Sequence, residues 1–137
     1  MAKKKILIVD DDSTISKALS ECFTRNGFDV IVESKSDKAL SFMRVQKIDG
    51  AIIDCMIPGM NGVDLAKKLR EELNFQDQIV LISGIFKDKN FAKSSIKKSA
   101  ATDFLFKPLD LDNILSIFTP DVSSCLLYTS PSPRDRG

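Results

Sequence analysis

Histidine is absent from the chain, and cysteine is scarce. Without histidine, the sequence excludes a histidine general base and any metal site built on imidazole ligands. The three cysteines, Cys22, Cys55 and Cys125, lie far apart and lack the paired spacing of a thiolate metal site. In an intracellular chain we expect them to stay reduced.

Long apolar runs and an excess of one charge are also missing. The longest apolar runs, such as Ile6–Val9 and Ile79–Ile82, are far too short to cross a bilayer. The basic N-terminus precedes only four apolar residues, too few for a secretory signal, so we expect a cytoplasmic protein. Lys and Arg number 20 against 19 Asp and Glu, a balance that gives no indication of nucleic-acid or membrane binding.

Short apolar runs alternate with amphipathic segments along the chain. The runs predict buried strands at residues 6–9, 28–32, 50–53, 79–82 and 104–106. Helices are predicted between them, with N-caps at Ser13 and Ser36, and then over residues 61–73, 88–98 and 111–118. Five alternations of strand and helix in about 120 residues predict a doubly wound α/β fold with a parallel sheet.

Polar residues follow four of the predicted strands. They are Asp10 and Asp11 after the first, Asp54 after the third, Ser83 after the fourth and Lys107 after the fifth. Parallel sheets place their sites at these strand ends, so we expect the side chains to share one cleft. Clustered carboxylates repel one another, and Mg²⁺, which prefers oxygen ligands, relieves that repulsion. An amine and a hydroxyl suit phosphoryl oxygens, and one carboxylate can act as a nucleophile and form an aspartyl phosphate.

Four segments around these residues form one pattern. They are Ile6–Asp11, Asp54 with Met56–Gly62, Ser83–Gly84 and Phe104–Pro108. In order and spacing they resemble the response-regulator receivers of two-component systems, from residue 5 to about residue 118. Each segment alone is a weak signal, but the combination is specific. The resemblance implies a five-stranded sheet in the flavodoxin-like order 2-1-3-4-5, with helices on both faces.

The resemblance implies a Mg²⁺ site and a phosphoacceptor. Asp10 and Asp11 match the acidic pair that holds Mg²⁺ directly or through water. Asp54 matches the phosphoacceptor, which is also a metal ligand. Met56 would supply its backbone carbonyl to the metal, so its side chain is free to vary.

The resemblance also implies a conformational switch. Ser83 matches the hydroxyl that turns toward the phosphoryl group, and Lys107 matches the cation that contacts it. The Lys107–Pro108 bond should be cis, as in the family. Phe104 falls at the aromatic switch position. Since phenylalanine has no hydroxyl, only burial of its ring can report the state.

Partners follow from the same resemblance. The chain would be a phosphoacceptor switch, not an enzyme, that catalyses its own phosphorylation and dephosphorylation. The expected donor is a sensor histidine kinase or a phosphotransfer protein, and the expected target is a downstream protein or an output domain. We expect no direct nucleic-acid binding by this domain and no membrane contact.

Three nearby features have simpler interpretations. Asp12 is interpreted as a cap or a solvated loop residue. Cys55, beside the acceptor, is interpreted as a small packed residue rather than a redox centre. The basic run Lys87–Lys98 is interpreted as a solvated face that borders the surface receivers use for partners.

Other functions compete with this interpretation. A haloacid-dehalogenase-type phosphatase would use Asp10 as nucleophile and Asp12 as acid/base, with Ser83 and Lys107 as later motifs. It leaves Asp54–Gly62 unexplained, and no acidic motif follows Lys107. A flavodoxin-like flavin binder would need a hydroxyl-rich phosphate loop where the chain has aspartates. A receiver that is never phosphorylated is disfavoured because the whole site is present.

The last residues differ in character from the rest. Cys125–Asp135 resembles a translated sequencing adapter, and a natural disordered tail rich in Ser and Pro is the alternative. We therefore expect a receiver domain over residues 1–124 and a tail over residues 125–137. If the adapter interrupts the reading frame, the natural protein can continue past Ser124, and whether an output domain follows is left open.

Overall fold

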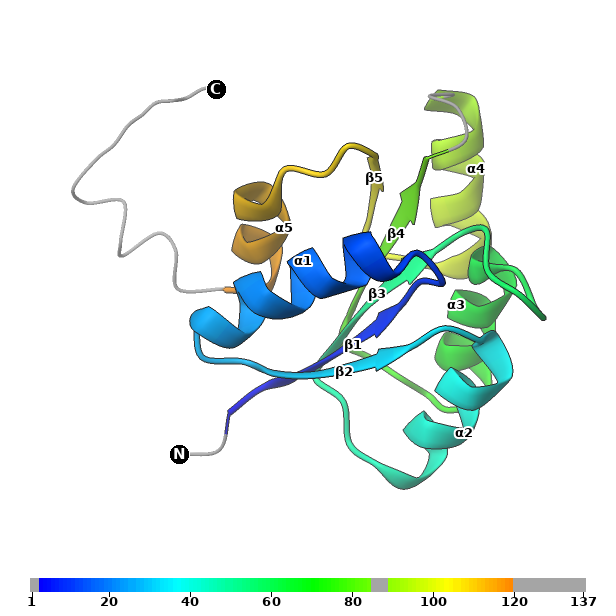
Figure 1. The fold of residues 1–137 in the computed structure, drawn as a ribbon. Helices are drawn as coiled ribbons and strands as arrows, with labels where there is room; N and C mark the ends of the chain where they lie inside the picture. Colours follow the sequence, from blue (N-terminus) through cyan, green and yellow to red (C-terminus); the bar gives the residue numbers. More distant parts are fainter. Residues whose placement is uncertain (1–2, 85–88, 120–137) are drawn as a thin grey trace.

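Strands and helices alternate throughout the computed structural model, which describes residues 3–84 and 89–119 (Figure 1). The strands are β1 (Lys5–Val9), β2 (Asp29–Glu33), β3 (Gly50–Asp54), β4 (Gln78–Ser83) and β5 (Asp103–Phe106). The helices are α1 (Ser13–Arg25), α2 (Ser36–Val45), α3 (Gly62–Glu71), α4 (Lys89–Ser99) and α5 (Leu111–Phe118). These bounds lie within two residues of the predicted ones, apart from residue 88, which is outside the described residues.

The five strands form one parallel sheet in the order β2-β1-β3-β4-β5. β1 pairs with β2 on one side and β3 on the other, so Val9 lies opposite both Glu33 and Ile53. Asp54, the last residue of β3, lies opposite Ile82 of β4. The predicted fold class and strand order are confirmed, and the C-terminal ends of the strands share one edge.

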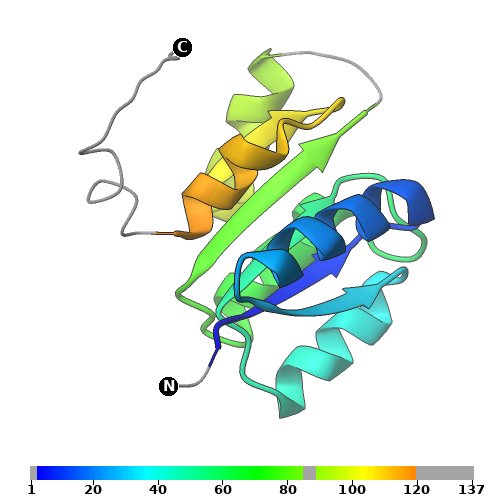
Figure 2. The ribbon, with the colours of Figure 1, turned by 60° about the vertical axis from the view of Figure 1, so that its left-hand side comes forward.

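Helices cover both faces of the sheet. α1 and α5 lie on one face and α2, α3 and α4 on the other (Figures 1 and 2). Phe23 and Phe118 of the first pair pack over one side of the sheet, which includes Ile52. Leu65 of α3 packs over the other side, which includes Ile53. Because the sheet is buried on both faces, its central strands are continuous apolar runs rather than alternating ones.

Two predicted helix caps are wrong. α1 begins at Ser13, but its N-cap is Asp12, whose carboxylate accepts a hydrogen bond from the backbone N–H of Thr14 (2.9 Å). The Asp12 side chain occupies the N-cap position, and its charge also interacts with the positive end of the helix dipole. The N-cap of α2 is Lys35, without a side-chain hydrogen bond, because the Ser36 hydroxyl is engaged by another loop.

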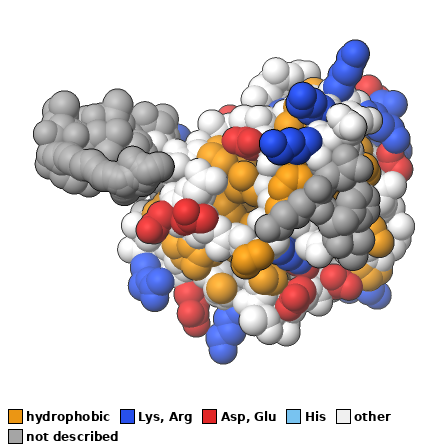
Figure 3. Space-filling model, turned by 90° about the horizontal axis from the view of Figure 1, so that it is seen from above, with side chains coloured by type: hydrophobic (Ala, Val, Ile, Leu, Met, Phe, Trp, Pro, Cys, Tyr) orange, Lys and Arg blue, Asp and Glu red, His pale blue; other side chains and the backbone are white. Residues whose placement is uncertain are grey.

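The described surface carries mixed charges. None of the described helices has the length and apolar character needed to cross a membrane. On the face seen from above, acidic, basic and apolar side chains are interspersed (Figure 3). The lysines of α4 are exposed, and Lys98 pairs with Asp64 of α3 at 3.3 Å. This agrees with a solvated basic face, although Lys87 lies outside the described residues.

Substitution of Phe23 tests the core between α1, α5 and the sheet. Phe23 is fully buried and makes edge-on contacts with Phe28 and Phe118, at ring distances of 5.2 Å and 5.7 Å. Phe23→Ala should lower the free energy of unfolding by about 3–5 kcal/mol, because it removes buried apolar surface and leaves a cavity. Urea unfolding followed by circular dichroism measures this. The control Val45→Ala, at a side chain 78% exposed, should stay within about 0.5 kcal/mol of the parent chain.

Candidate phosphoacceptor site

A lysine joins two buried carboxylates at the C-terminal edge of the sheet. Asp10 follows β1, Asp54 ends β3, and Lys107 follows β5. The Nζ atom of Lys107 donates a hydrogen bond to Oδ2 of Asp54 at 2.7 Å and lies 3.3 Å from Oδ2 of Asp10. Both aspartates are at most 4% exposed. Three of the predicted site residues therefore meet in one buried cluster.

Backbone amides orient the two carboxylates in the same way. Oδ1 of Asp10 accepts a hydrogen bond from the N–H of Asp12 (2.9 Å), and Oδ1 of Asp54 accepts one from the N–H of Met56 (2.8 Å). Each carboxylate thus has one oxygen fixed by the loop that follows it and one that faces Lys107. After each strand the backbone turns so that the N–H two residues later points at the aspartate carboxylate. An aspartate at the strand end is enough to form this contact.

Burial and the charges in the cluster shift the pKa values of Asp10 and Lys107. The pKa of Asp10 is raised to about 6, mainly by burial and also by the negative charge of Asp54. The amide of Asp12 and the charge of Lys107 act in the opposite direction. Burial lowers the pKa of Lys107, but the hydrogen bond and charge of Asp54, with the charge of Asp10, outweigh burial and raise it. The ammonium is therefore held charged between carboxylates that repel each other.

Two glycines let the backbone approach the cluster closely. A side chain at Gly62, the first residue of α3, would overlap the backbone carbonyl of Asp54. A side chain at Gly84 would lie 3.0 Å from the stem of Lys107. Sequence reasoning treated both only as parts of the family pattern. A glycine at the start of a helix, as at Gly62, is the local signal that indicates a close approach of this kind.

Ser83 and Phe104 flank the cluster on β4 and β5. Ser83 is buried, and its carbonyl accepts a hydrogen bond from the N–H of Lys107 at 2.8 Å. Phe104 is 8% exposed and contacts Phe91 of α4 and Phe106, at ring distances of 5.8 Å and 5.3 Å. The aromatic ring is therefore packed inward, between the sheet and α4. The Lys107–Pro108 bond is cis, as predicted.

Cys55 is a packed residue, as interpreted from the sequence. It is 4% exposed, and burial, with the charge of Asp54, raises the pKa of its thiol to about 12. A thiol with so high a pKa stays protonated at neutral pH and is a poor nucleophile. Cys55 is therefore not a reactive thiol at neutral pH.

The predicted convergence of three carboxylates is not found. In the part of the chain that the structure describes, no group of three carboxylate, imidazole or thiol side chains could hold a metal ion. Asp10 and Asp54 meet at Lys107, whereas Asp11 is exposed. The physical reason is that Asp11 directly follows Asp10, so its side chain points in a different direction and is exposed.

The donor set still fits a hard cation. Oδ2 of Asp10 is buried and makes no hydrogen bond, and the charge it faces is the ammonium of Lys107 at 3.3 Å, so its lone pairs can accept a further cation. Mg²⁺ takes one or two carboxylates and keeps several waters. Two carboxylates and a backbone carbonyl of the following loop are therefore a sufficient set of protein ligands.

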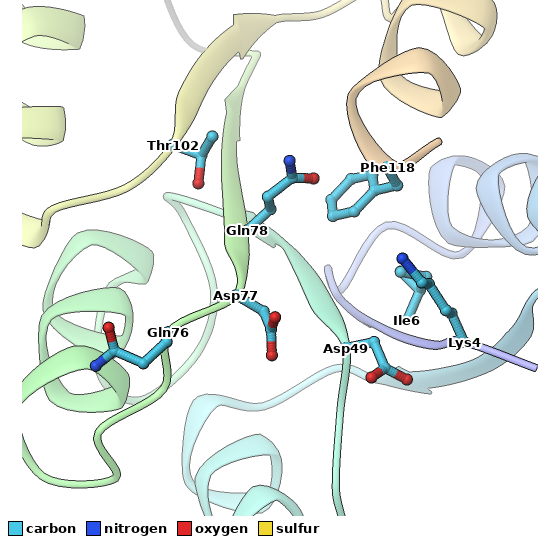
Figure 4. Close-up of a pocket in the computed structure, with 8 residues that line it drawn as sticks. All are labelled: Lys4, Ile6, Asp49, Gln76, Asp77, Gln78, Thr102 and Phe118. Atoms are coloured by element: carbon cyan, nitrogen blue, oxygen red, sulfur yellow. The ribbon is translucent and has the colours of Figure 1, made fainter. Parts of the chain in front are cut away.

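The opposite edge of the sheet holds a pocket of a different kind. Asp49, Asp77, Gln78 and Phe118 are among the residues that line it (Figure 4). Oδ2 of Asp49 accepts a hydrogen bond from the N–H of Lys5 at 2.8 Å, so this carboxylate connects two strands. The predicted site residues all lie at the other edge.

Comparison with known proteins decides the family. Residues 6–119 match the family model of the response regulator receiver domain. The chain belongs to this family. As a receiver domain of two-component systems it is a phosphoacceptor switch rather than a classical enzyme. Receivers generally bind Mg²⁺ and act between histidine kinases and output targets.

Several similar proteins are response regulators. The alkaline phosphatase synthesis transcriptional regulatory protein PhoP of Bacillus subtilis is 33% identical over 105 residues, 77% of this chain and 42% of PhoP. The receiver domain of the Francisella response regulator 1452 is 26% identical, with a TM-score of 0.78 over 90% of this chain and 99% of that one. The BeF3-activated N-terminal receiver domain of Klebsiella pneumoniae RstA is 28% identical, with a TM-score of 0.74 over 82% of this chain and 93% of that one. This receiver thus spans less than half the length of PhoP.

The phosphatase alternative is not supported. The family match covers the segments that it left unexplained. Asp12, its acid/base, is exposed and caps α1 with its carboxylate. The interpretation of Asp12 as a cap is confirmed.

Asp10→Asn tests the electrostatic cost of the buried cluster. The native chain keeps a proton on Asp10 up to about pH 6, whereas the unfolded chain releases it near pH 3.8. The native state therefore binds more protons between these values, and its free energy of unfolding falls as the pH rises through that window. Asp10→Asn has no ionisable group at this position, so its free energy of unfolding does not fall for this reason. Its stability relative to the parent chain should increase by on the order of 1–3 kcal/mol from pH 4 to pH 7, without divalent metal.

Urea unfolding followed by circular dichroism at several pH values measures the difference. A difference between the two chains that stays constant from pH 4 to pH 7 would show that Asp10 does not titrate abnormally.

Proposed function

We propose that this receiver takes a phosphoryl group on Asp54 from a sensor histidine kinase or a phosphotransfer protein, with Mg²⁺. The arrangement that carries the proposal is the buried set of Asp10, Asp54 and Lys107, joined at 2.7 Å and 3.3 Å through one ammonium. A structural ion pair alone would need one carboxylate. Two carboxylates lie around one cation at the C-terminal edge of the sheet, where parallel α/β sheets bind their ligands. This arrangement suits binding of a further cation and an anion.

Asp54 is the better candidate for the nucleophile. Its Oδ1 is fixed by the Met56 amide and its Oδ2 by Lys107, so the carboxylate is held in one orientation. Burial raises the pKa of Asp10, so its carboxylate ionises less readily than that of an exposed aspartate. In the step itself, one carboxylate oxygen of Asp54 bonds to phosphorus as the bond between phosphorus and the donor's imidazole nitrogen breaks. The imidazole leaves with the electron pair of that bond.

Lys107 and the metal ligands have separate roles. Lys107 already touches the acceptor, so its ammonium can follow the charge onto the phosphoryl oxygens. Asp10, Asp54 and the backbone carbonyl of Met56 would hold Mg²⁺, and the exposed Asp11 would contribute through water. When bound, the ion would offset the negative charge of the phosphoryl oxygens. The Met56 side chain is 59% exposed, which agrees with a role for its backbone alone.

Ser83 and Phe104 are proposed to transmit the change. Ser83 lies one residue beyond Ile82, the neighbour of Asp54 across β3 and β4. A movement of its hydroxyl toward the phosphoryl group would free space that the Phe104 ring can fill. Phe104 is held by Phe91 of α4, so the helix would move with the ring. The surface of α4, β5 and α5 would then bind the target differently.

The receiver is proposed to catalyse its own phosphorylation and dephosphorylation. Small phosphodonors should then suffice, because the groups that stabilise the transferring phosphoryl belong to this chain. We further propose that the domain spans residues 1–124, that residues 125–137 lie outside it, and that the target is a downstream protein or an output domain.

Acetyl phosphate tests the acceptor and the metal together. With Mg²⁺ the chain should gain one phosphoryl group on Asp54, found by reductive trapping and mass spectrometry. The adduct should fall to background in Asp54→Asn and when Mg²⁺ is removed by a chelator. Asp12→Asn is the matched control, because asparagine caps a helix as well as aspartate does. It should be labelled as the parent chain is.

A phosphoryl adduct on Asp10 that persists in Asp54→Asn would contradict the assignment of Asp54 as the phosphoacceptor. No adduct on any residue would instead mean that the domain serves only as an interaction module.

A further inference from the structure

A buried serine on α2 contacts the loop that follows the phosphoacceptor. Ser36 is 1% exposed. Its Oγ accepts a hydrogen bond from the N–H of Met60 (2.6 Å) and donates one to the carbonyl of Pro58 (3.2 Å). The backbone N–H of Ser36 donates to the same carbonyl at 3.4 Å. Three hydrogen bonds thus join the first residue of α2 to the middle of the loop between β3 and α3.

This loop, residues 55–61, carries the Met56 carbonyl proposed for the metal. Its ends are fixed locally. The N–H of Met56 bonds to the Asp54 side chain (2.8 Å), and the N–H of Gly62 bonds to the Cys55 carbonyl (3.0 Å). The middle has Gly59 at φ +89°, where a side chain would lie 2.7 Å from Oγ of Ser36. The loop therefore rests directly on Ser36.

The same short connection also touches the other acidic segment. The carbonyl of Glu33, the last residue of β2, accepts a hydrogen bond from the N–H of Asp10 at 3.1 Å. Ser36 follows three residues later. The segment 33–36 therefore contacts the backbone of Asp10 on one side and the loop after Asp54 on the other. It connects the edge strand β2 to α2 and contributes no side chain to the proposed chemistry.

We propose that Ser36 is a positioning residue that sets where the loop after Asp54 lies relative to Asp10. Loss of its hydroxyl leaves the N–H of Met60 and the carbonyl of Pro58 without their side-chain partner, so the loop shifts to satisfy them elsewhere. A shift there moves the Met56 carbonyl with respect to the two carboxylates. Small displacements of ligands weaken metal binding and transfer. The inference rests on the proposed function, because it assigns Ser36 a role in the same Mg²⁺ and phosphoryl site.

Another buried serine provides a matched control. Ser99, at the end of α4, is also 1% exposed, and its Oγ likewise makes two hydrogen bonds, to the carbonyl of Ser95 (2.7 Å) and from the N–H of Ala101 (3.3 Å). It precedes β5, so it lies at the opposite edge of the sheet from the carboxylates. Ser99→Ala should lower stability about as much as Ser36→Ala does, without a reason to affect metal binding.

The experiment measures the affinity for Mg²⁺ by calorimetric titration without a phosphodonor, and the Mg²⁺ dependence of labelling by acetyl phosphate. Ser36→Ala should bind Mg²⁺ about three- to tenfold more weakly and need correspondingly more Mg²⁺ for half-maximal labelling. The rate at saturating Mg²⁺ should change less than the affinity. Ser36→Thr, which keeps a hydroxyl, should recover most of the affinity. Ser99→Ala should bind Mg²⁺ as the parent chain does.

Two outcomes would overturn the inference. If Ser36→Ala and Ser99→Ala, both folded by circular dichroism, bind Mg²⁺ equally well, Ser36 is a structural residue only. The same holds if Ser36→Thr folds and binds as weakly as Ser36→Ala. A parent chain that binds Mg²⁺ but is never labelled would count against the proposed function alone, because the titration still tests Ser36. A parent chain that binds no Mg²⁺ would overturn both.

Discussion

The ammonium of Lys107, between the carboxylates of Asp10 and Asp54, is the interaction on which the site depends. The three residues lie at the C-terminal ends of different strands, β1, β3 and β5. They meet only because all strands run parallel and end at one edge of the sheet. Two buried carboxylates so close together repel each other, and one cation makes their burial tolerable. The fold supplies the rest: apolar strands covered on both faces, and glycines where α3 and the β4 end approach the cluster.

Such a site lowers the stability of the domain that contains it. The raised pKa of Asp10 means that its ionised form is held at a cost at neutral pH, and Oδ2 of Asp10 has no hydrogen bond. Buried polar atoms usually have hydrogen bonds, and this oxygen has only its ion pair with Lys107, which agrees with the proposed metal site. A hard cation at that oxygen would add the missing interaction. The cost of burying these carboxylates and the proposed affinity for a metal would therefore have the same cause.

The sequence predicted the parts of this structure that depend on local patterns. Apolar runs located the strands, and their alternation with helices gave the parallel sheet. The strand ends then placed Asp10, Asp54 and Lys107 at one edge. Prediction from the sequence failed where contacts between residues far apart in the chain, or the direction of a single side chain, determine the structure. Ser36 is a good helix cap by its type, yet a loop more than twenty residues away engages its hydroxyl. Asp11 follows Asp10 directly, but adjacent residues point in different directions, and only Asp10 is buried beside Lys107.

The same geometry explains how a local charge change could reach the surface of the domain. Lys107 is linked to its surroundings by its side chain, to Asp54 and Asp10, and by its backbone N–H, to the carbonyl of Ser83. Phe104 lies three residues earlier on the same strand and packs against Phe91 of α4. The Lys107 ammonium already pairs with two carboxylates. A phosphoryl group on Asp54 would add negative charge beside it, so the ammonium would form a different set of ion pairs with Asp10, Asp54 and the phosphoryl oxygens. The shift toward an active state can be no larger than the difference in these interactions between the two states. The Phe104 ring, which can only be packed or exposed, would then report the change through α4 and not through a hydrogen bond of its own.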